Sequence, residues 1–125
     1  MAPRFERDAP AAGPVVTGFA AGGFTVEGRT HAGLLLTPER AVGWQAPALA
    51  ELSEAALEPI LSLEPPPEFL ILGTGAATAF PPAAFRRALQ ARGIGIEAMD
   101  SRAAARTWGL LRAEGRWIVA AILPL

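Results

Sequence analysis

The second half of the chain alternates short apolar runs with amphipathic segments, and this alternation restricts the fold more than any other feature. Residues 69–72 are continuously apolar, which is typical of a strand covered on both faces. Strand-like runs recur at residues 94–98 and 117–123, and the two segments between the runs carry apolar residues at helical spacing. The order strand, helix, strand, helix, strand predicts right-handed crossovers between parallel strands.

Start and stop signals bound the two helices of this unit. The prolines at 81–82 suit a helix start, because proline is tolerated in the first turn, and Gly93 suits the end of the same helix. Asp100 or Ser101 is the expected N-cap of the second helix. Trp108 falls on the apolar face of that helix, so we expect it to pack in the core.

The first half reads as β structure followed by a helix. Glycines interrupt the short apolar runs of residues 15–46, which predicts a meander of three or four strands. Apolar residues between 49 and 63 share one helical face, with Ser53 available as an N-cap and residues 64–67 (Glu-Pro-Pro-Pro) as the stop. One helix is therefore predicted for this segment.

The chain has 125 residues, which is the usual size of one domain. We expect a mixed α/β domain over residues 15–125, in which an N-terminal β-hairpin or meander joins a central mixed sheet covered by the helices. Residues 1–14 contain several prolines and alanines and are expected to form a flexible tail.

Several kinds of chemistry are excluded by the residue types that the chain lacks. There is no Cys, Lys, Tyr or Asn and only one His, so a Cys nucleophile, a thiolate metal site and a Lys Schiff base are impossible. The net charge is −1, which provides no global attraction for nucleic acid or for an anionic membrane. No apolar stretch approaches the ~18 residues of a membrane span, so no direct membrane insertion is expected.

The start of the sequence shows neither a secretory signal nor an amphipathic presequence rich in Arg and Ser. The abundance of Ala, Gly, Pro and Arg is typical of a GC-rich genome. Together these features predict a bacterial protein of the cytoplasm.

Two connections leave the carboxyl ends of strands that are predicted to be parallel: residues 73–75 (Gly73, Thr74 and Gly75) and residues 99–101, which include Asp100. In open α/β sheets ligands bind at this edge, so we expect the two segments to lie close together and to form a candidate site. Glycines allow close approach of a backbone, and a helix N-terminus suits an anion or a partner's acceptor. The alternative is turn chemistry alone, with glycine for tight bends and Asp100 as an N-cap.

Nucleotide, catalytic and metal sites are less well supported. The Gly73-Thr74-Gly75 turn lacks the third glycine of a dinucleotide fingerprint, and residues 76–81 separate it from the next helix. A P-loop is excluded because the chain has no Lys. His31 could act in a Ser-His-Asp triad, but the sequence has no Gly-x-Ser-x-Gly motif to supply the serine nucleophile. The acidic residues show no metal-ligand spacing. We therefore predict no cofactor and no metal.

Four arginines, Arg102, Arg106, Arg112 and Arg116, cluster in the last third of the chain with tryptophans between them. A nucleic-acid surface would be basic with exposed aromatic residues. Because Trp108 is expected in the core and acidic residues dilute the charge, a solvated or protein-binding face is favoured over a nucleic-acid interface.

The runs 70–76 (Leu-Ile-Leu-Gly-Thr-Gly-Ala), 91–100 (Ala-Arg-Gly-Ile-Gly-Ile-Glu-Ala-Met-Asp) and 105–116 (Ala-Arg-Thr-Trp-Gly-Leu-Leu-Arg-Ala-Glu-Gly-Arg) resemble the Mth938-like domain family in content and order. The resemblance covers about residues 15–125 and implies a compact three-layer fold around a mixed sheet. It also implies a protein-binding role, since the mitochondrial relatives act in the assembly of respiratory complex I.

The sequence departs from the common pattern of that family on the last helix. Ala105 stands where many relatives carry Cys, and residues 108–109 are Trp-Gly where many carry Tyr-Asn. Thiol chemistry is therefore absent at this point.

Three functions remain open. The first is a non-enzymatic protein-binding module, such as an accessory factor for a membrane complex, with an unidentified protein partner. The second is a small-molecule site at Gly73-Thr74-Gly75 and Asp100, with Arg106 and Thr107 contributing to binding or weak catalysis. The third is a structural homo-oligomer.

Overall fold

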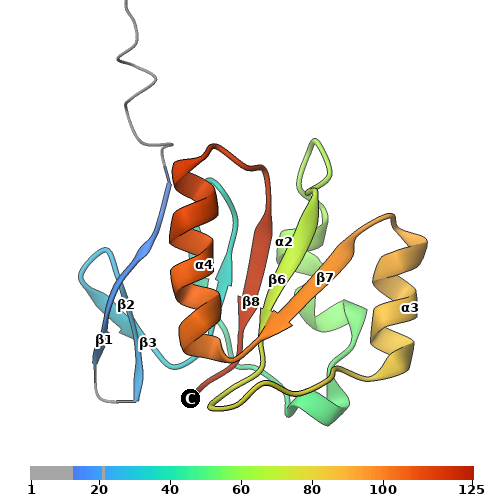
Figure 1. Cartoon of the computed structure of the whole chain (residues 1–125), viewed down its shortest axis with the longest axis horizontal. Helices are drawn as coiled ribbons and strands as arrows, with labels where there is room; N and C mark the ends of the chain where they lie inside the picture. The colour runs from blue at the N-terminus through green and yellow to red at the C-terminus, as the bar shows by residue number, and fades with distance from the viewer. Residues whose placement is uncertain (1–12, 21) are drawn as a thin grey trace, which may run out of the picture.

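The computed structural model describes residues 13–20 and 22–125, and it contains two β-sheets. A small antiparallel sheet consists of β1 (Val16–Ala20), β2 (Gly23–Val26) and β3 (Arg29–His31). The main sheet has the order β5-β4-β8-β6-β7 and comprises β4 (Leu34–Leu36), β5 (Ala41–Gly43), β6 (Phe69–Gly73), β7 (Gly95–Met99) and β8 (Val119–Ile122). Figure 1 shows the small sheet beside the main one.

The β-α-β-α-β unit is confirmed, and it forms the parallel half of the main sheet. β6 pairs in parallel with β7 on one side and with β8 on the other. The crossovers are α3 (Ala83–Ala91) and α4 (Ser101–Ala113). Their limits follow from the expected signals: Pro82 precedes α3, Gly93 has a positive φ of 78° just after it, and Asp100 caps α4.

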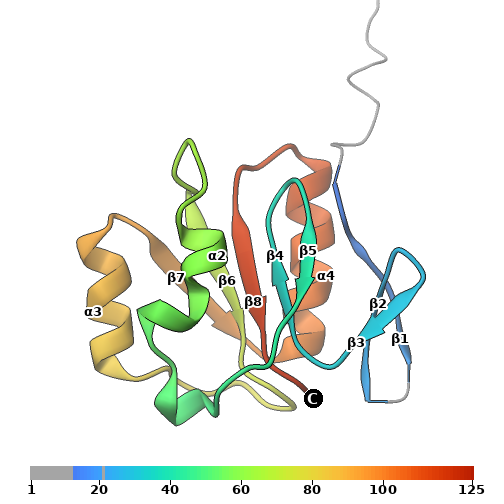
Figure 2. The same cartoon turned by 180° about the vertical axis from the view of Figure 1, so that it is seen from behind.

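The main sheet lies between two layers of helices, as Figures 1 and 2 show from opposite sides. On one face, α3 and the short helical segments bury a cluster that includes Leu70, Leu72 and Val119. On the other face, α4 and the small sheet bury a cluster that includes Ile71 and Ala120. Because side chains alternate between the faces of a strand, each central strand contributes to both clusters. This is the three-layer arrangement that the resemblance implies.

The N-terminal meander has three strands, within the predicted number, but it ends at His31 and does not extend to residue 46. Only β1–β3 form it, whereas β4 and β5 join the main sheet because β4 pairs antiparallel with β8, the last strand of the chain. The first twelve residues of the expected tail (1–14) lie outside the described residues. Pro14 is buried, and its carbonyl accepts a hydrogen bond of 2.9 Å from Trp108 Nε1, so Pro14 belongs to the described fold.

The single helix predicted between residues 49 and 63 is wrong. The structure has two short 3₁₀ turns, η1 (Leu49–Glu51) and η2 (Glu54–Leu57), and then α2 (Glu58–Leu61). Pro59 would break a continuous helix because it has no N–H to donate, and it is accommodated here in the first turn of α2. Ser53 does occupy the N-cap position of η2, although its side chain makes no capping hydrogen bond.

None of the helices found in the described residues is long and apolar enough to cross a membrane.

Candidate functional site

The two segments predicted to form a site do lie together, at the carboxyl ends of β6 and β7. The amide of Thr74 donates to the carbonyl of Met99 at 2.8 Å, and the amide of Ser101 donates to the carbonyl of Gly75 at 2.8 Å. The end of the chain joins the same edge, because the amide of Leu123 donates to the carbonyl of Gly73 at 2.9 Å. We refer to this edge, where residues 73–75, residues 99–101 and Leu123 meet, as the seam.

The side chain of Ser101 links two segments of this seam by hydrogen bonds. Its side chain is fully buried, and its hydroxyl donates to the carbonyl of Leu123 at 2.7 Å and accepts from the amide of Gly75 at 2.8 Å. The sequence suggested Ser101 only as an alternative to Asp100 for capping α4. What could not be read from sequence is that its hydroxyl satisfies buried backbone groups of two distant segments.

Gly73 is required by the close approach of α4 to β6. A Cβ at this position would lie 2.8 Å from Ser101 Oγ, 3.0 Å from Ser101 Cα and 3.1 Å from the Cβ of Ala104. Gly75 has a φ of 107°, a region in which side-chain-bearing residues are strained. Both glycines of the turn thus have a conformational or packing requirement.

The polar side chains of the seam are also engaged within the chain. The hydroxyl of Thr74 lies 2.7 Å from the carbonyl of Ala77 and 3.1 Å from that of Met99, and it accepts from the amide of Ala79. Asp100 Oδ1 accepts from the amide of Ala103 at 2.9 Å, which caps α4. The Thr74 contacts with Ala77 and Ala79 belong to the turn and the Asp100 contact is a cap, whereas the Thr74–Met99 contact joins the turn to the end of β7. Structural contacts within the chain thus account for the residue types.

The other two predicted site residues lie further along α4. Arg106 is exposed and Thr107 is half-buried. Arg106 stands six positions after Asp100 in the sequence, which corresponds to roughly 9 Å along the helix axis. Within the described residues, no hydrogen bond or ion pair joins Arg106 or Thr107 to the seam. The structure therefore brings together residues 73–75 and Asp100 and leaves Arg106 and Thr107 apart from them.

The four clustered arginines do not share one surface. The Arg102 guanidinium stacks 5.0 Å from the centre of the Phe19 ring. Arg112 is 7% exposed and donates to the carbonyl of Arg116 at 2.6 Å, and burial lowers the pKa of its guanidinium. Arg116 pairs with Glu68 on the surface. Structural contacts thus account for three of the four.

The Glu-Gly-Arg turn at 114–116 lies at the opposite end of the sheet from the seam. Arg116 donates two hydrogen bonds to Glu68 Oε1, at 2.8 and 3.0 Å, and the amide of Trp117 donates to Glu68 Oε2. These hydrogen bonds lower the pKa of Glu68, and the bond from the Arg116 side chain contributes most. The same pairing with Glu68 raises the pKa of Arg116. The contacts tie the start of β6 to the approach of β8, which is a structural role.

Replacing Glu68 by Gln should remove one pH-dependent part of the stability. A carboxyl whose pKa is lowered by folding stabilises the fold above its unfolded pKa, about 4.3 for Glu, and this contribution is lost as the pH falls through the folded value. We expect the difference in thermal midpoint between wild type and Glu68→Gln to be constant from pH 7 to 5 and to shrink below about pH 4. The check is a series of melting curves from pH 7 to 2.5, and a difference that persists unchanged at pH 2.5 would contradict it.

His31 lies on β3 against the edge of the main sheet. It is half-buried, and a Cβ at Gly43, the last residue of β5, would come 3.1 Å from its Nδ1. The strands β3 and β5 therefore pack closely at this point. Among the described residues, no group of three or more His, Asp or Glu side chains is placed to hold a metal ion.

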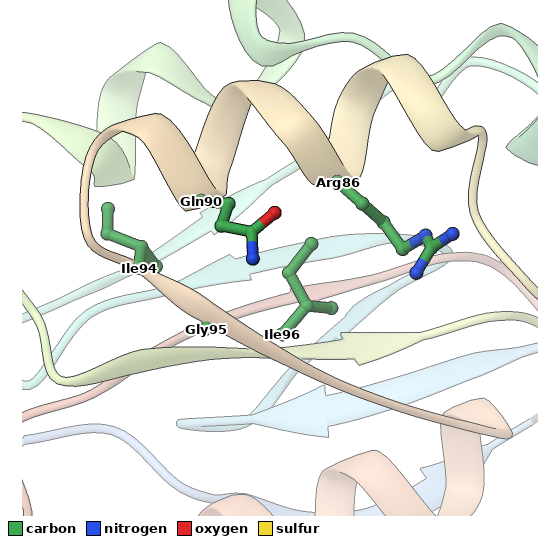
Figure 3. A pocket seen from close by; sticks show the side chains of 5 residues that line it. All are labelled: Arg86, Gln90, Ile94, Gly95 and Ile96. Carbon is green, nitrogen blue, oxygen red and sulfur yellow. The ribbon is translucent and has the colours of Figure 1, made fainter.

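A second feature of the surface was not predicted. A shallow cavity of about 180 Å³ lies between α3 and β7 and is lined by Arg86, Gln90, Ile94, Gly95 and Ile96. Figure 3 shows the side chains of Arg86 and Gln90 directed from α3 toward the strand. The signal in the sequence was weak, because the alternation of residues 94–98 does not reveal that β7 ends the sheet.

Comparison with known proteins gives consistent results. The family model described as "Protein of unknown function (DUF498/DUF598)" matches residues 16–123. The chain is similar to NADH dehydrogenase (ubiquinone) 1 alpha subcomplex assembly factor 3 of Danio rerio, with 33% identity over 90% of this chain and 66% of that protein. The same factor of Bos taurus is 31% identical over 95% of this chain and 65% of the relative. The chain thus spans slightly less than two thirds of the length of these curated relatives.

Solved structures extend the similarity to three dimensions. A crystal structure of a protein from Bordetella parapertussis matches with a TM-score of 0.80 and 35% identity, covering 91% of this chain and 98% of that one. A solution NMR structure of a Mth938-like domain from Bordetella pertussis matches with a TM-score of 0.73 and 28% identity, covering 99% and 90%. The chain belongs to the DUF498/DUF598 family and has the Mth938-like fold.

Proposed function

We propose that this chain is a non-enzymatic protein-binding module that acts in the cytoplasm as an accessory factor in assembling a membrane complex of the respiratory NADH dehydrogenase type. The observation that carries the proposal is the similarity to assembly factor 3, which extends over 90% of the chain at 33% identity. The aligned region therefore includes nearly the whole described domain rather than an isolated motif.

The geometry of the seam supports binding of a protein rather than chemistry. The hydroxyls of Thr74 and Ser101 and one carboxylate oxygen of Asp100 are all engaged by backbone groups of the chain. Such groups position a surface but are poorly placed to act on a substrate. A partner would instead meet the loop that follows Gly75.

An exposed aromatic residue on that loop is the strongest candidate for contact with a partner. Phe80 is 91% exposed and lies between the seam and α3. Leu110, on α4, is 69% exposed. Large aromatic side chains supply much of the binding energy at protein interfaces, whereas an exposed phenylalanine gains nothing within the monomer.

The experiment is affinity purification of the tagged chain from its native host, with bound proteins quantified against a tagged unrelated domain. We expect at least one subunit or assembly partner of a membrane complex to be enriched. Enrichment of no protein above the control would contradict the proposal.

Phe80→Ser tests the loop within the same experiment. Because the ring is almost fully exposed, the free energy of unfolding should change by less than about 0.5 kcal/mol. Loss of an aromatic anchor should weaken partner binding by about 2 kcal/mol. Leu110→Ser is the matched control for loss of exposed apolar surface on another element. Equal retention of the partner by wild type and Phe80→Ser would exclude the loop from the interface.

A small-molecule site is the second candidate function, and the observation that favours it is the convergence of Gly73, Thr74, Gly75 and Asp100 at the carboxyl edge of the sheet. Arg106 and Thr107 would then lie at its periphery. A thermal-shift screen with a metabolite library tests this candidate. A saturable rise in the melting temperature that Asp100→Asn abolishes would establish it, and the protein-binding proposal predicts no such rise.

A further inference from the structure

The main sheet ends in a strand whose outer edge is unpaired. β7 is last in the order β5-β4-β8-β6-β7, and among the described residues it pairs only with β6. The carbonyl of Met99 accepts from Thr74 on the β6 side. Because successive residues of a strand direct their backbone groups to opposite sides, Ile96 and Ala98 direct their N–H and C=O groups outward. Four backbone hydrogen-bonding groups are thus available in a row.

This edge has few of the features that usually prevent pairing with another chain. Exposed edges are commonly shortened, bulged or interrupted by proline. β7 has five residues without proline, its register with β6 is continuous, and Glu97 is its one charged residue. The cavity of about 180 Å³ runs beside the strand, which leaves room for side chains of an added strand under α3.

The two faces of the edge carry opposite charges. Arg86 extends from α3 over the face on which Ile96 packs, as Figure 3 shows. Glu97 lies on the opposite face, since it is adjacent to Ile96 in the strand. Both side chains belong to exposed residues, and within the described part of the chain neither has an ion-pair partner.

We propose that the β7 edge binds an extended segment of the partner protein as an added strand, with an acidic side chain facing Arg86 and a basic side chain opposite Glu97. Main-chain hydrogen bonds to Ile96 and Ala98 provide the attachment, and the two charges select the sequence and its orientation. Gln90 adds an amide donor and acceptor at the same groove. This inference rests on the proposed protein-binding function and names the surface and the partner chemistry that serve it.

A second copy of this chain fits the edge less well. Two copies could pair their β7 strands antiparallel about a two-fold axis. If all four outward N–H and C=O groups are used, Ile96 of one copy pairs with Ala98 of the other. That register sets Glu97 directly opposite Glu97 at a non-hydrogen-bonded pair, where side chains are closest and like charges are destabilising. A register shifted toward Ile94 is hindered because the Ile94 amide already donates to the carbonyl of Leu89.

The first test uses two synthetic heptapeptides and the folded chain labelled with ¹⁵N. The probe has the sequence Thr-Val-Arg-Asp-Arg-Val-Thr, which places its acid on one face and its bases on the other. The charge-swapped peptide is Thr-Val-Glu-Lys-Glu-Val-Thr. We expect the probe to cause saturable shifts centred on the amides of Ile96 and Ala98, with affinity roughly threefold or more above that of the swapped peptide. Shifts centred elsewhere, or none at millimolar peptide, would overturn the proposal.

Two pairs of variants make the test specific. Ala98→Pro removes an outward N–H while the pairing with β6 is kept, since proline is tolerated where the N–H faces solvent at a sheet edge. Ala98→Ser keeps that N–H and is its control. Arg86→Glu should remove most of the preference for the probe, because one of the two charge contacts then favours the swapped peptide while Glu97 still favours the probe. Arg87→Glu, an exposed neighbour outside the cavity, should leave the preference unchanged. Unchanged preference in Arg86→Glu would contradict the assigned charge pairing even if Ala98→Pro failed to fold.

The proposed function and the assigned surface can fail separately. If wild type enriches a host protein and Ala98→Pro enriches it equally, the β7 assignment is wrong and the protein-binding function stands. If wild type enriches nothing, the function fails, and the peptide shifts decide whether the edge binds strands. A dimer that Ala98→Pro dissociates, measured by light scattering, would assign the edge to self-association and overturn the proposal.

Discussion

Replacing Trp108 by Ala is expected to lower the free energy of unfolding by about 3–5 kcal/mol, the largest effect of any substitution considered. Trp108 is fully buried on α4 and packs in the cluster that contains Phe24, Ile71 and Ile118. It therefore links the main sheet to the small sheet. Its indole N–H also bonds the carbonyl of Pro14, which alanine would leave without that donor.

Urea denaturation of wild type and variant measures this effect, because the midpoint falls in proportion to the lost free energy when the slope is unchanged. Leu110→Ala is the control. It lies on the same helix at 69% exposure and should change the free energy of unfolding by less than about 0.5 kcal/mol. Similar effects of the two substitutions would show that Trp108 does not join the two sheets as described.

The second large effect is expected at Gly73. An alanine there places Cβ 3.0 Å from Ser101 Cα and 3.1 Å from the Cβ of Ala104, so α4 must move away from β6. Overpacking of this kind costs about 1–3 kcal/mol. The displacement would also strain the hydrogen bonds of Ser101 to Gly75 and Leu123, whose partners are buried.

Gly109→Ala is the matched control for the same chemical change on α4. A Cβ at Gly109 meets no atom within 4 Å, and alanine favours the helix by about 0.5–1 kcal/mol over glycine. We therefore expect opposite signs: Gly73→Ala destabilises and Gly109→Ala stabilises. A neutral or stabilising Gly73→Ala, measured by thermal and urea denaturation, would contradict the close packing of α4 on β6.

The parallel half of the fold could be predicted because its signals are local. The continuous apolar run of β6, the prolines before α3, Gly93 after it and the cap at Asp100 each act within a few residues of where they stand. Their order then fixed the crossovers, since right-handed parallel connections leave few alternatives.

The first half could not be predicted to the same extent because its strands pair over long distances. Glycine-rich turns marked where strands begin and end, but they carry no information that β4 joins β8 near the end of the chain. In the segment between residues 49 and 63 the apolar spacing indicated which side chains face the core. Pro59 opposes a continuous helix, and the apolar spacing alone does not show this.

The candidate site shows the same division. Proximity of the Gly73–Gly75 turn to Asp100 followed from strand direction alone. The role of Ser101 did not, because its two partners lie 22 and 26 residues away along the chain. The open edge of β7 was also hidden, since strand order depends on how the N-terminal strands attach to the sheet.

We propose that this chain assists the assembly of a membrane complex through protein contacts. The most direct measurement is the amount of fully assembled NADH dehydrogenase in membranes of a host strain that lacks this chain, determined on native gels. We expect a lower amount of the complete complex, accumulation of partial assemblies, and restoration by wild type but not by Ala98→Pro. An undiminished complex in the deletion strain would contradict it.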